Sequence, residues 1–436
     1  MQRGWWRALT ATAVALLVGA CSSSSSKSSP TTGAAGSTPA TSGQSSSLTA
    51  SAPGVTRTTI TIGYIASLTG VASSTYADGV AGAMARIKEQ NAAGGVDGRQ
   101  LVLVSRDDQS TPAQNAIASQ QLVSQNVFGV ENFSSFAFGG ARFLSQKRIP
   151  VAGFAVDGPE WAQQPNTNMF SYSAPTTTPF NGINYTYDYG GKFLKSVGVT
   201  KLASLSYGIS PSAITAAKGL IAAAKSAGIT DCYDNFSVPF GAVDFTAAVL
   251  AVKSKGCDGT SAPFVEASDV ALSGALKQGG VSGPQLFYTG YSNDVLDNPA
   301  ARASLQDAYI TTQINFTTPN AAVAHMLDEF KKYVPTYKGG IPDLGLYGSY
   351  LATDLMIKGL QVAGMNPTRE SFISALRNVS DYTANGILPS PTSFTNFGTK
   401  AMLPTSACSY FVQLKGNQYV VTNGGKAICG NLIPIQ

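Results

Sequence analysis

The side chains that most often carry out nucleophilic or acid–base catalysis are scarce in this chain. His325 is the only histidine among 436 residues, so any Ser–His or Cys–His scheme would have to use it. Apolar residues on the expected helix 321–333 share one face and leave His325 toward solvent. Asp107 and Asp108 are adjacent at a strand end, point apart and do not form a glycosidase pair. The sequence therefore argues against an enzyme, and an unrecognised carboxylate pair is the enzymatic alternative.

Hydroxyl and aromatic side chains recur directly after segments that have the length and composition of buried strands. In open α/β sheets, small ligands bind at the carboxyl ends of the strands. Hydroxyls and backbone N–H groups can hold a polar group there, while aromatic rings enclose the rest of the ligand. The candidate ligand-binding residues in these loops are Ser67, Thr69, Phe133, Ser134, Ser135, Ala155, Asp157, Tyr207, Ser210, Phe264, Glu266, Tyr291 and Asp294.

The elements that would position these loops are clearest in residues 60–112. An apolar run of strand length at 60–65 is followed by apolar residues at helical spacing over 77–91 and by a second buried strand. Gly94 and Gly95 follow the helix, where a left-handed cap costs glycine little. Strand and helix signals then alternate through most of the chain. The pattern predicts an α/β fold with mostly parallel sheets.

This segment resembles the start of the solute-binding proteins of branched-chain amino-acid (leucine/isoleucine/valine) ABC importers. Their first helix ends on N-A-A-G-G-V-x-G-R, which corresponds to residues 91–99, and their first strand is followed by a small-residue loop like residues 67–70. The resemblance implies a type I periplasmic binding protein fold, with two Rossmann-like lobes and a three-segment hinge. It also implies solute binding without catalysis. Another doubly wound sheet is the alternative.

The resemblance implies that the chain passes between the lobes three times. We place lobe 1 at residues 58–175 and 317–388, and lobe 2 at residues 176–316 and 389–436, because the segments at these boundaries are rich in Pro or Thr and lack strong periodicity. Two lobes on such a hinge can close on a ligand. Two rigidly packed domains are the alternative.

The resemblance also assigns expected roles to single residues. A serine in relatives binds the ligand's α-carboxylate, and Ser134 or Ser135 occupies its place. Asp157 replaces a threonine that assists it, and an aspartate there would repel a carboxylate. Asp294 lies where relatives present an acid to the α-ammonium, and Glu266 lies where they carry a ring and nearby polar groups, so both are candidate partners for a cation. We therefore expect a small polar, amino-acid-like or partly aromatic ligand with a hydroxyl, amide or cationic group at Asp157; helix capping is the alternative role for the serines and Asp157.

The N-terminal residues predict export and a lipid anchor. Arg3 and Arg7 precede an apolar run that is too short to span a membrane and ends in Val-Gly-Ala before Cys21. Residues 1–20 are expected to be a signal peptide, and the junction resembles a bacterial lipobox with Cys21 as the lipidated residue. Residues 21–57, mostly Ser, Thr, Ala, Gly and Pro, are expected to form a disordered tether that reaches roughly 30 Å. A plain secretory signal and a dispensable tail are the alternatives.

The other four cysteines predict two disulfides. They are an even set in an exported chain, and the local pairs Cys232–Cys257 and Cys408–Cys429 close the shortest loops. No pair has CxxC spacing, which argues against a metal site. The net charge of +5 falls to about +3 without the two signal-peptide arginines, and the charges are interspersed, which argues against a nucleic-acid partner.

Together, these features predict a monomeric, lipid-anchored solute receptor on the extracytoplasmic face of the cell membrane. Its expected partners are a small-molecule ligand, an ABC permease and, through the lipid, the membrane surface. No cofactor is expected. A ligand-sensing receptor of the same fold and a secreted hydrolase are the alternatives.

Overall fold

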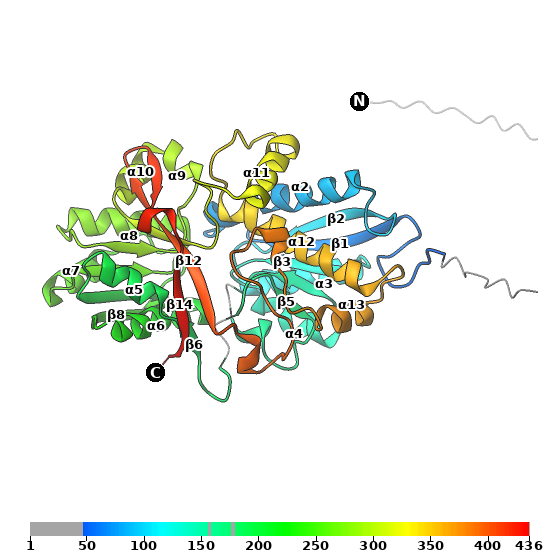
Figure 1. Cartoon of the computed structure of the whole chain (residues 1–436), viewed down its shortest axis with the longest axis horizontal. Coiled ribbons are helices and arrows are strands. Elements are labelled where there is room, and N and C mark those ends of the chain that lie inside the picture. The colour runs from blue at the N-terminus through cyan, green and yellow to red at the C-terminus, as the bar shows by residue number, and fades with distance from the viewer. Residues whose placement is uncertain (1–46, 156–157, 176–178, 436) are drawn as a thin grey trace, which may run out of the picture. The chain divides into compact units, whose positions relative to one another are not determined.

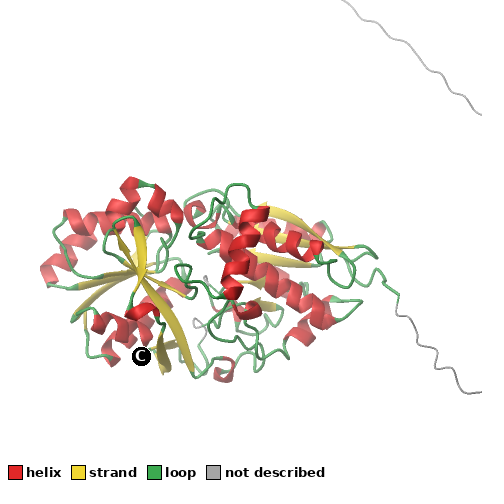
Figure 2. Cartoon of the chain, turned by 45° about the horizontal axis from the view of Figure 1, so that its top comes forward, coloured by secondary structure: helices red, strands yellow, loops and turns green. Residues whose placement is uncertain are grey.

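The computed structural model describes residues 47–155, 158–175 and 179–435. The described strands form two sheets, each with helices packed against it, so this part of the chain consists of two α/β lobes (Figures 1 and 2). The predicted fold class, with parallel sheets in two lobes, is confirmed. Cys21, Asp157, the predicted signal peptide and residues 21–46 of the predicted tether lie outside the described residues. The tether prediction is wrong for residues 47–57, which pack on lobe 1: the Thr49 N–H donates to Asn366 at 2.9 Å and Val55 is buried in the core.

Lobe 1 contains a five-stranded sheet in which all neighbouring strands are parallel. Its order is β2 (Gln100–Asp107), β1 (Thr59–Ala66), β3 (Gly129–Phe133), β4 (Val151–Gly153) and β5 (Met169–Ser171). The helices of this lobe are α1 (Ser73–Tyr76), α2 (Gly79–Ala92), α3 (Pro112–Ser124), α4 (Phe138–Gln146), α11 (Ala321–Tyr333), α12 (Leu344–Ala363) and α13 (Arg369–Leu376), with short 3-10 turns η1 (Pro159–Trp161) and η2 (Ala384–Gly386).

Lobe 2 contains a nine-stranded mixed sheet. Its order is β6 (Tyr185–Tyr187), β14 (Ile428–Pro434), β12 (Ser406–Lys415), β11 (Tyr309–Thr312), β10 (Gln285–Phe287), β9 (Gly259–Ala262), β7 (Lys201–Tyr207) and β8 (Thr230–Val238), with β13 (Gln418–Val421) paired to β12. The strands from β7 to β11 are parallel, whereas β12, β13, β14 and β6 pair antiparallel. Its helices are α5 (Tyr189–Ser196), α6 (Pro211–Ser226), α7 (Thr246–Lys255), α8 (Glu266–Gln278), α9 (Asn293–Asp297) and α10 (Pro299–Leu305), with 3-10 turns η3 (Lys400–Met402) and η4 (Asn423–Gly425).

Glycine fixes two features of the first βαβ unit. Gly94 and Gly95 have φ of 100° and 77°, the left-handed region expected where α2 ends. At Gly82, a Cβ atom would lie 1.9 Å from the carbonyl oxygen of Leu346, so the missing side chain lets α2 pack directly on α12. Lobe 1 is therefore completed by a helix from much later in the chain.

The chain passes between the lobes in three segments, which follow β5, β11 and η2. The third segment keeps contact with lobe 1 for several residues, because Phe394 packs against Phe170 at 5.6 Å between ring centroids. The residue ranges that we predicted for the lobes remain predictions.

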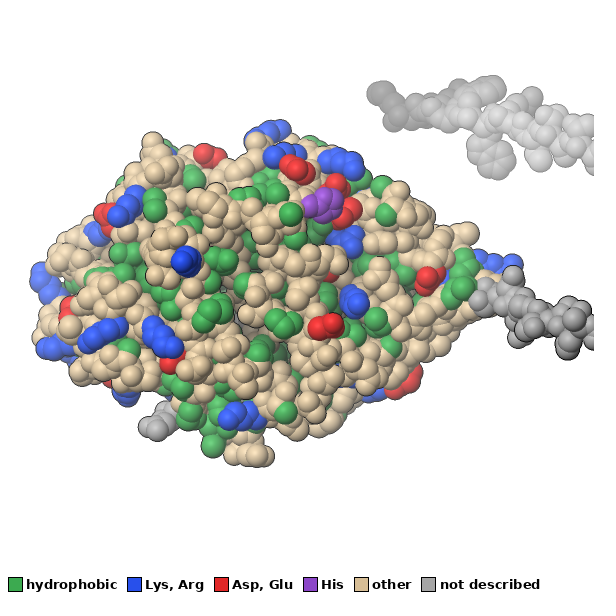
Figure 3. Space-filling model, in the orientation of Figure 1, with side chains coloured by type: hydrophobic (Ala, Val, Ile, Leu, Met, Phe, Trp, Pro, Cys, Tyr) green, Lys and Arg blue, Asp and Glu red, His purple; other side chains and the backbone are tan. Residues whose placement is uncertain are grey.

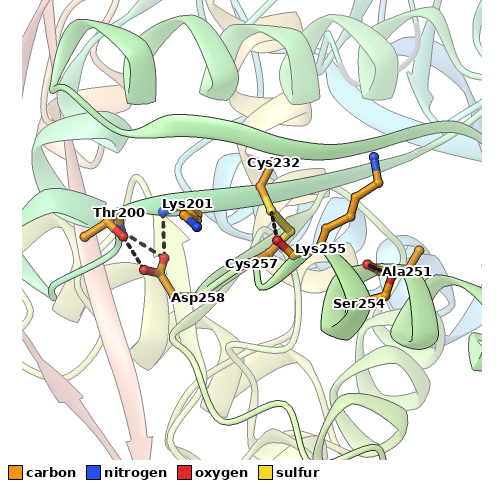
Figure 4. The surroundings of a disulfide bond; sticks show 8 residues. All are labelled: Thr200, Lys201, Cys232, Ala251, Ser254, Lys255, Cys257 and Asp258. Carbon is orange, nitrogen blue, oxygen red and sulfur yellow. Dashed lines mark hydrogen bonds between the residues drawn. A yellow bond between two sulfur atoms is a disulfide. The ribbon is translucent and has the colours of Figure 1, made fainter.

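Two disulfides cross-link lobe 2, and their local pairing is the predicted one. Cys232–Cys257 joins β8 to the turn after α7 (Figure 4). In the same turn, Asp258 accepts the backbone N–H groups of Thr200 and Lys201 at 2.9 and 2.7 Å. Cys408–Cys429 bridges directly opposed residues of β12 and β14.

Acidic and basic side chains are scattered over the face in Figure 3. His325 is exposed, as predicted, and its Nε2 lies 2.9 Å from a carboxylate oxygen of Glu89. Within the described ranges, we find neither a helix that meets the length and hydropathy of a membrane span nor a metal-binding group of three His, Cys, Asp or Glu side chains.

A buried glutamate lies between the lobe 1 sheet and α12. Glu131 on β3 is fully buried, and its Oε2 accepts the hydroxyl of Thr353 at 2.7 Å, while its Oε1 has no partner. Burial raises the pKa of Glu131 from its ordinary value of 4.5 to about 8. The folded protein therefore holds this carboxyl in the protonated form at neutral pH.

The substitution Glu131→Gln should flatten the pH dependence of stability. The folded state binds more protons than the unfolded state between pH 4.5 and about 8, so the free energy of unfolding falls as pH rises through this window. A neutral amide removes that loss, and we expect the variant to gain roughly 2–4 kcal/mol relative to the wild type between pH 5 and pH 9. Urea titrations at both pH values measure this difference. A constant offset between the two proteins would contradict it.

Candidate ligand-binding cleft

A cavity of about 340 Å³ lies between the two lobes. Its walls come from segments that follow β4, β5, β7, β9, β10 and β11, together with α12, the third hinge segment and part of β12. The carboxyl ends of the parallel strands in both sheets therefore open onto one space, as the fold requires. The volume is at the small end of the range for small-molecule sites.

The lobe 1 wall is a set of parallel aromatic rings. Phe154, just after β4, and Tyr172, just after β5, line the cavity and stack at 4.9 Å with an angle of 6°. Phe133 packs against Tyr172 from behind at 6.4 Å and 15°. Phe133 ends β3, while Phe154 and Tyr172 follow β4 and β5, so the three rings come from the same edge of three neighbouring parallel strands.

The lobe 2 wall is also aromatic. Tyr207 ends β7, and its ring lies 4.3 Å from that of Phe264 and 4.6 Å from that of Phe240. The Tyr207 hydroxyl accepts the backbone N–H of Val265 at 3.2 Å. Ring contacts and this hydrogen bond together fix the position of the Tyr207 side chain. A flat or ring-shaped molecule would thus meet aromatic surface on either side.

The cavity is neutral over its described lining. No Asp, Glu, Lys, Arg or His belongs to the described lining residues. Polarity comes instead from hydroxyls and one amide. The polar residues besides tyrosine are Ser135, Ser173, Ser210, Ser212, Thr289, Thr311, Thr312, Gln313, Ser390, Thr392 and Ser409.

Five of the predicted binding residues line this cavity: Ser135, Ala155, Tyr207, Ser210 and Phe264. The Ser135 hydroxyl is 2.8 Å from that of Tyr76, another lining residue. Ser210 also caps α6 by accepting the N–H of Ala213, so the capping alternative holds for it alongside its place in the wall.

The structure places other predicted residues in supporting positions. Ser67 and Ser134 both donate to the buried carboxylate of Asp108, Ser67 at 2.8 Å, and neither lines the cavity. Thr69 is exposed and bonds to Asp107. Phe133 backs the lobe 1 wall. Asp108, which sequence reasoning treated only as half of a failed catalytic pair, thus organises two of the loops.

Glu266 and Tyr291 line a second, much smaller cavity of about 20 Å³ that adjoins the first. Glu266 Oε2 accepts the Ser292 hydroxyl at 3.1 Å, and the Tyr291 hydroxyl is 2.9 Å from that of Thr317. Asp294, on α9, lines neither cavity. These three residues therefore lie beside the main cavity rather than in its wall.

Several acids meet at this side of the cleft without a described basic partner. Burial, with a contribution from Asp294, raises the pKa of Glu266 to about 7. Burial also raises the pKa of Asp343, the N-cap of α12, to about 8, with contributions from Asp78 and Asp294. At neutral pH, a substantial share of these carboxyls is protonated.

The lobes touch beside the cavity. The N–H of Glu266 donates to Thr75 of lobe 1 at 3.1 Å. The Phe136 and Phe240 rings meet edge to face at 4.8 Å. Lobe 1 also contacts Asn293 of α9, whose side chain donates to Gly339 at 2.7 Å. The described conformation is thus one in which the two lobes are in contact.

A family model described as periplasmic binding protein matches residues 59–419. The chain belongs to the periplasmic binding protein family. The resemblance drawn from residues 60–112 is therefore confirmed. Periplasmic binding proteins bind solutes and are not enzymes, which agrees with the scarcity of catalytic side chains.

Comparisons with individual proteins agree with this family assignment. The chain is 26% identical over 330 residues to Leu/Ile/Val-binding protein homolog 3 of Brucella melitensis, covering 73% of this chain and 83% of that protein. Its structure resembles a fatty acid ABC transporter substrate-binding protein from Thermomonospora curvata (TM-score 0.68, 20% identity, 86% of this chain and 94% of that one). It also resembles an R. palustris ABC transporter solute-binding protein in complex with benzoate (TM-score 0.65, 16% identity, 86% and 97%). At these identities, the structures show a shared fold.

Sequence reasoning missed much of the wall of this periplasmic binding protein. Tyr172 directly follows β5 and Phe240 comes two residues after the end of β8, and this signal could have found them. Tyr347 of α12 lines both cavities. The contribution of β12, at Cys408 and Ser409, had no local signal, because it depends on the C-terminal strands joining the lobe 2 sheet.

Filling the cavity from α6 should abolish ligand binding without unfolding the protein. Ala216 lines the cavity, whereas Ala222, farther along the same helix, does not. We expect Ala216→Phe to weaken binding of any cavity ligand by at least tenfold, since the ring would occupy ligand space, while Ala222→Phe leaves affinity within about twofold. Calorimetry with both variants measures this. Equal effects would place the binding site elsewhere.

Proposed function

We propose that this protein is the extracytoplasmic solute-binding lipoprotein of an ABC importer, which captures a small molecule between its lobes and presents it to a membrane permease. The observation that carries this proposal is the cavity between the lobes. Residues of both lobes and of all three segments that connect them form its wall. A ligand there contacts both lobes at once only when they are together, so its binding favours the closed form.

The printed names of the relatives are consistent with transport of small organic molecules. They refer to Leu/Ile/Val binding, to a fatty acid transporter and to a complex with benzoate. Rings and hydroxyls line the cavity of this chain, which supports a small ligand that is polar and partly aromatic. Ser135, Ala155, Tyr207, Ser210 and Phe264 are the predicted residues that we propose touch the ligand.

A thermal-shift screen followed by small-angle scattering tests the proposal. Amino acids, amides, polyols, polyamines and aromatic acids form the panel. A ligand at 100 times its dissociation constant should raise the free energy of unfolding by about 2.7 kcal/mol. Each hit should also reduce the radius of gyration measured by small-angle scattering, because the ligand shifts the population toward the form with closed lobes. A hit that leaves the profile unchanged, or that binds Ala216→Phe as well as the wild type, would contradict hinge closure around this cavity.

We propose that membrane attachment depends on Cys21 and that the tether is the part of residues 21–57 that precedes Thr49, because Thr49 and Ser51 hydrogen-bond to lobe 1. We expect Cys21→Ser to move the protein from the membrane fraction to the soluble extracytoplasmic fraction, because no acyl chain can then be attached. Cys232→Ser, which removes a disulfide cysteine instead, is the control and should stay membrane-bound. Fractionation and immunoblotting measure the distribution. Persistence of the Cys21 variant in the membrane fraction would overturn the anchor.

A further inference from the structure

The cavity contains two pairs of tyrosines whose hydroxyls are not used within the described protein. Tyr172 and Tyr347 belong to lobe 1, Tyr189 and Tyr288 belong to lobe 2, and all four line the cavity. None of these hydroxyls bonds to another described residue, whereas that of Tyr207 accepts a backbone N–H. Tyrosine hydroxyls in buried settings normally have a partner. These four are therefore available to a bound molecule.

The members of each pair are close enough to influence one another. Burial is the main cause that raises the pKa of Tyr172, and Tyr347 adds to it. Burial likewise raises the pKa of Tyr288, with a contribution from Tyr189. All four hydroxyls therefore stay protonated at physiological pH and can donate hydrogen bonds. One donor pair lies on each lobe.

The described lining offers no partner for a full charge. A buried ammonium or carboxylate without an opposite charge or a dense set of hydrogen bonds is costly. Glu266 is the candidate partner for an ammonium, but it lies in the adjoining small cavity, where its carboxylate already accepts the Ser292 hydroxyl. Lysine and arginine are absent from the described lining. The main cavity thus favours an uncharged guest.

The rings define the shape of that guest. The stacked Phe154 and Tyr172 of lobe 1 and the Tyr207–Phe264 pair of lobe 2 present aromatic surface from both sides of one space. Aromatic surfaces pack best against another flat ring.

We propose, building on the function proposed above, that the solute is an uncharged, ring-bearing molecule whose amide, ketone or ether oxygens accept hydrogen bonds from both tyrosine pairs. Such a molecule connects lobe 1 to lobe 2 through its oxygens and fills the aromatic space with its ring. An amino-acid zwitterion and a carboxylate anion are both poorer guests, because the described lining residues carry no charge to pair with theirs.

Calorimetry at pH 7 with a matched set of probes tests the charge and the ring separately. Phenylalanine, 3-phenylpropanoate and 3-phenylpropanamide share one ring but carry a zwitterion, an anion and no charge. Leucine and 4-methylpentanamide replace the ring by a branched chain. We expect 3-phenylpropanamide to bind at least tenfold more tightly than each of the other four.

Removing single hydroxyls tests the tyrosine pairs. Tyr172→Phe and Tyr288→Phe keep the rings, and each should weaken binding of 3-phenylpropanamide about fivefold, as expected for one neutral hydrogen bond. Tyr309→Phe is the control, because Tyr309 packs against Phe193 and lines neither cavity. The control should change affinity less than twofold.

The outcomes separate this inference from the proposed function. Tighter binding of phenylalanine or leucine, or of 3-phenylpropanoate, overturns the uncharged ligand but keeps a solute-binding cleft. Unchanged affinity in both Tyr→Phe variants overturns the role of the tyrosine pairs. Failure of all five probes overturns the inference, whereas the broader screen and the scattering experiment still decide the proposed function.

Discussion

Parallel strands end at one edge of their sheet, and this constraint shapes the whole molecule. In lobe 1, the residues after β4 and β5 reach the cavity, and in lobe 2 those after β7, β9 and β10 do so. Each lobe by itself offers half of an aromatic wall. Only the three-segment hinge, which sets the two sheet edges opposite one another, makes these halves into one enclosed space.

The distribution of polarity divides the cleft into two parts. The main cavity is neutral and ring-lined over its described residues, and hydroxyls supply its polar contacts. The acids Glu266, Asp294 and Asp343 gather at its side, where burial raises the pKa of each. An ionised cluster would repel itself across the lobe contact. Because the pKa values of Glu266 and Asp343 are raised to about 7 and about 8, these two carboxyls are partly protonated at neutral pH, which reduces the repulsion across the lobe contact.

More of the fold than of the candidate site could be predicted from the sequence. The apolar spacing of residues 60–112 and the Gly94–Gly95 turn depend on local chemistry, so the first βαβ unit and the α/β class could be predicted. The same holds for Tyr207, which ends a buried strand, and for Phe264, which comes two residues after the end of one. Ser67 and Ser134 show the limit: a small hydroxyl at a strand end fits a ligand or a buried carboxylate equally well, and only the position of Asp108 decides between them. The antiparallel β12–β14 unit, which brings Cys408 to the cavity, depends on pairing between distant segments and leaves no local pattern.

A crystal structure of the protein purified from its own host, with its co-purified solute retained, tests the central claim most directly. The account predicts electron density for one small molecule between Tyr172 of lobe 1 and Tyr207 of lobe 2, in contact with both rings. Density confined to the outer surface of one lobe, or a gap filled by the protein's own side chains, would contradict it.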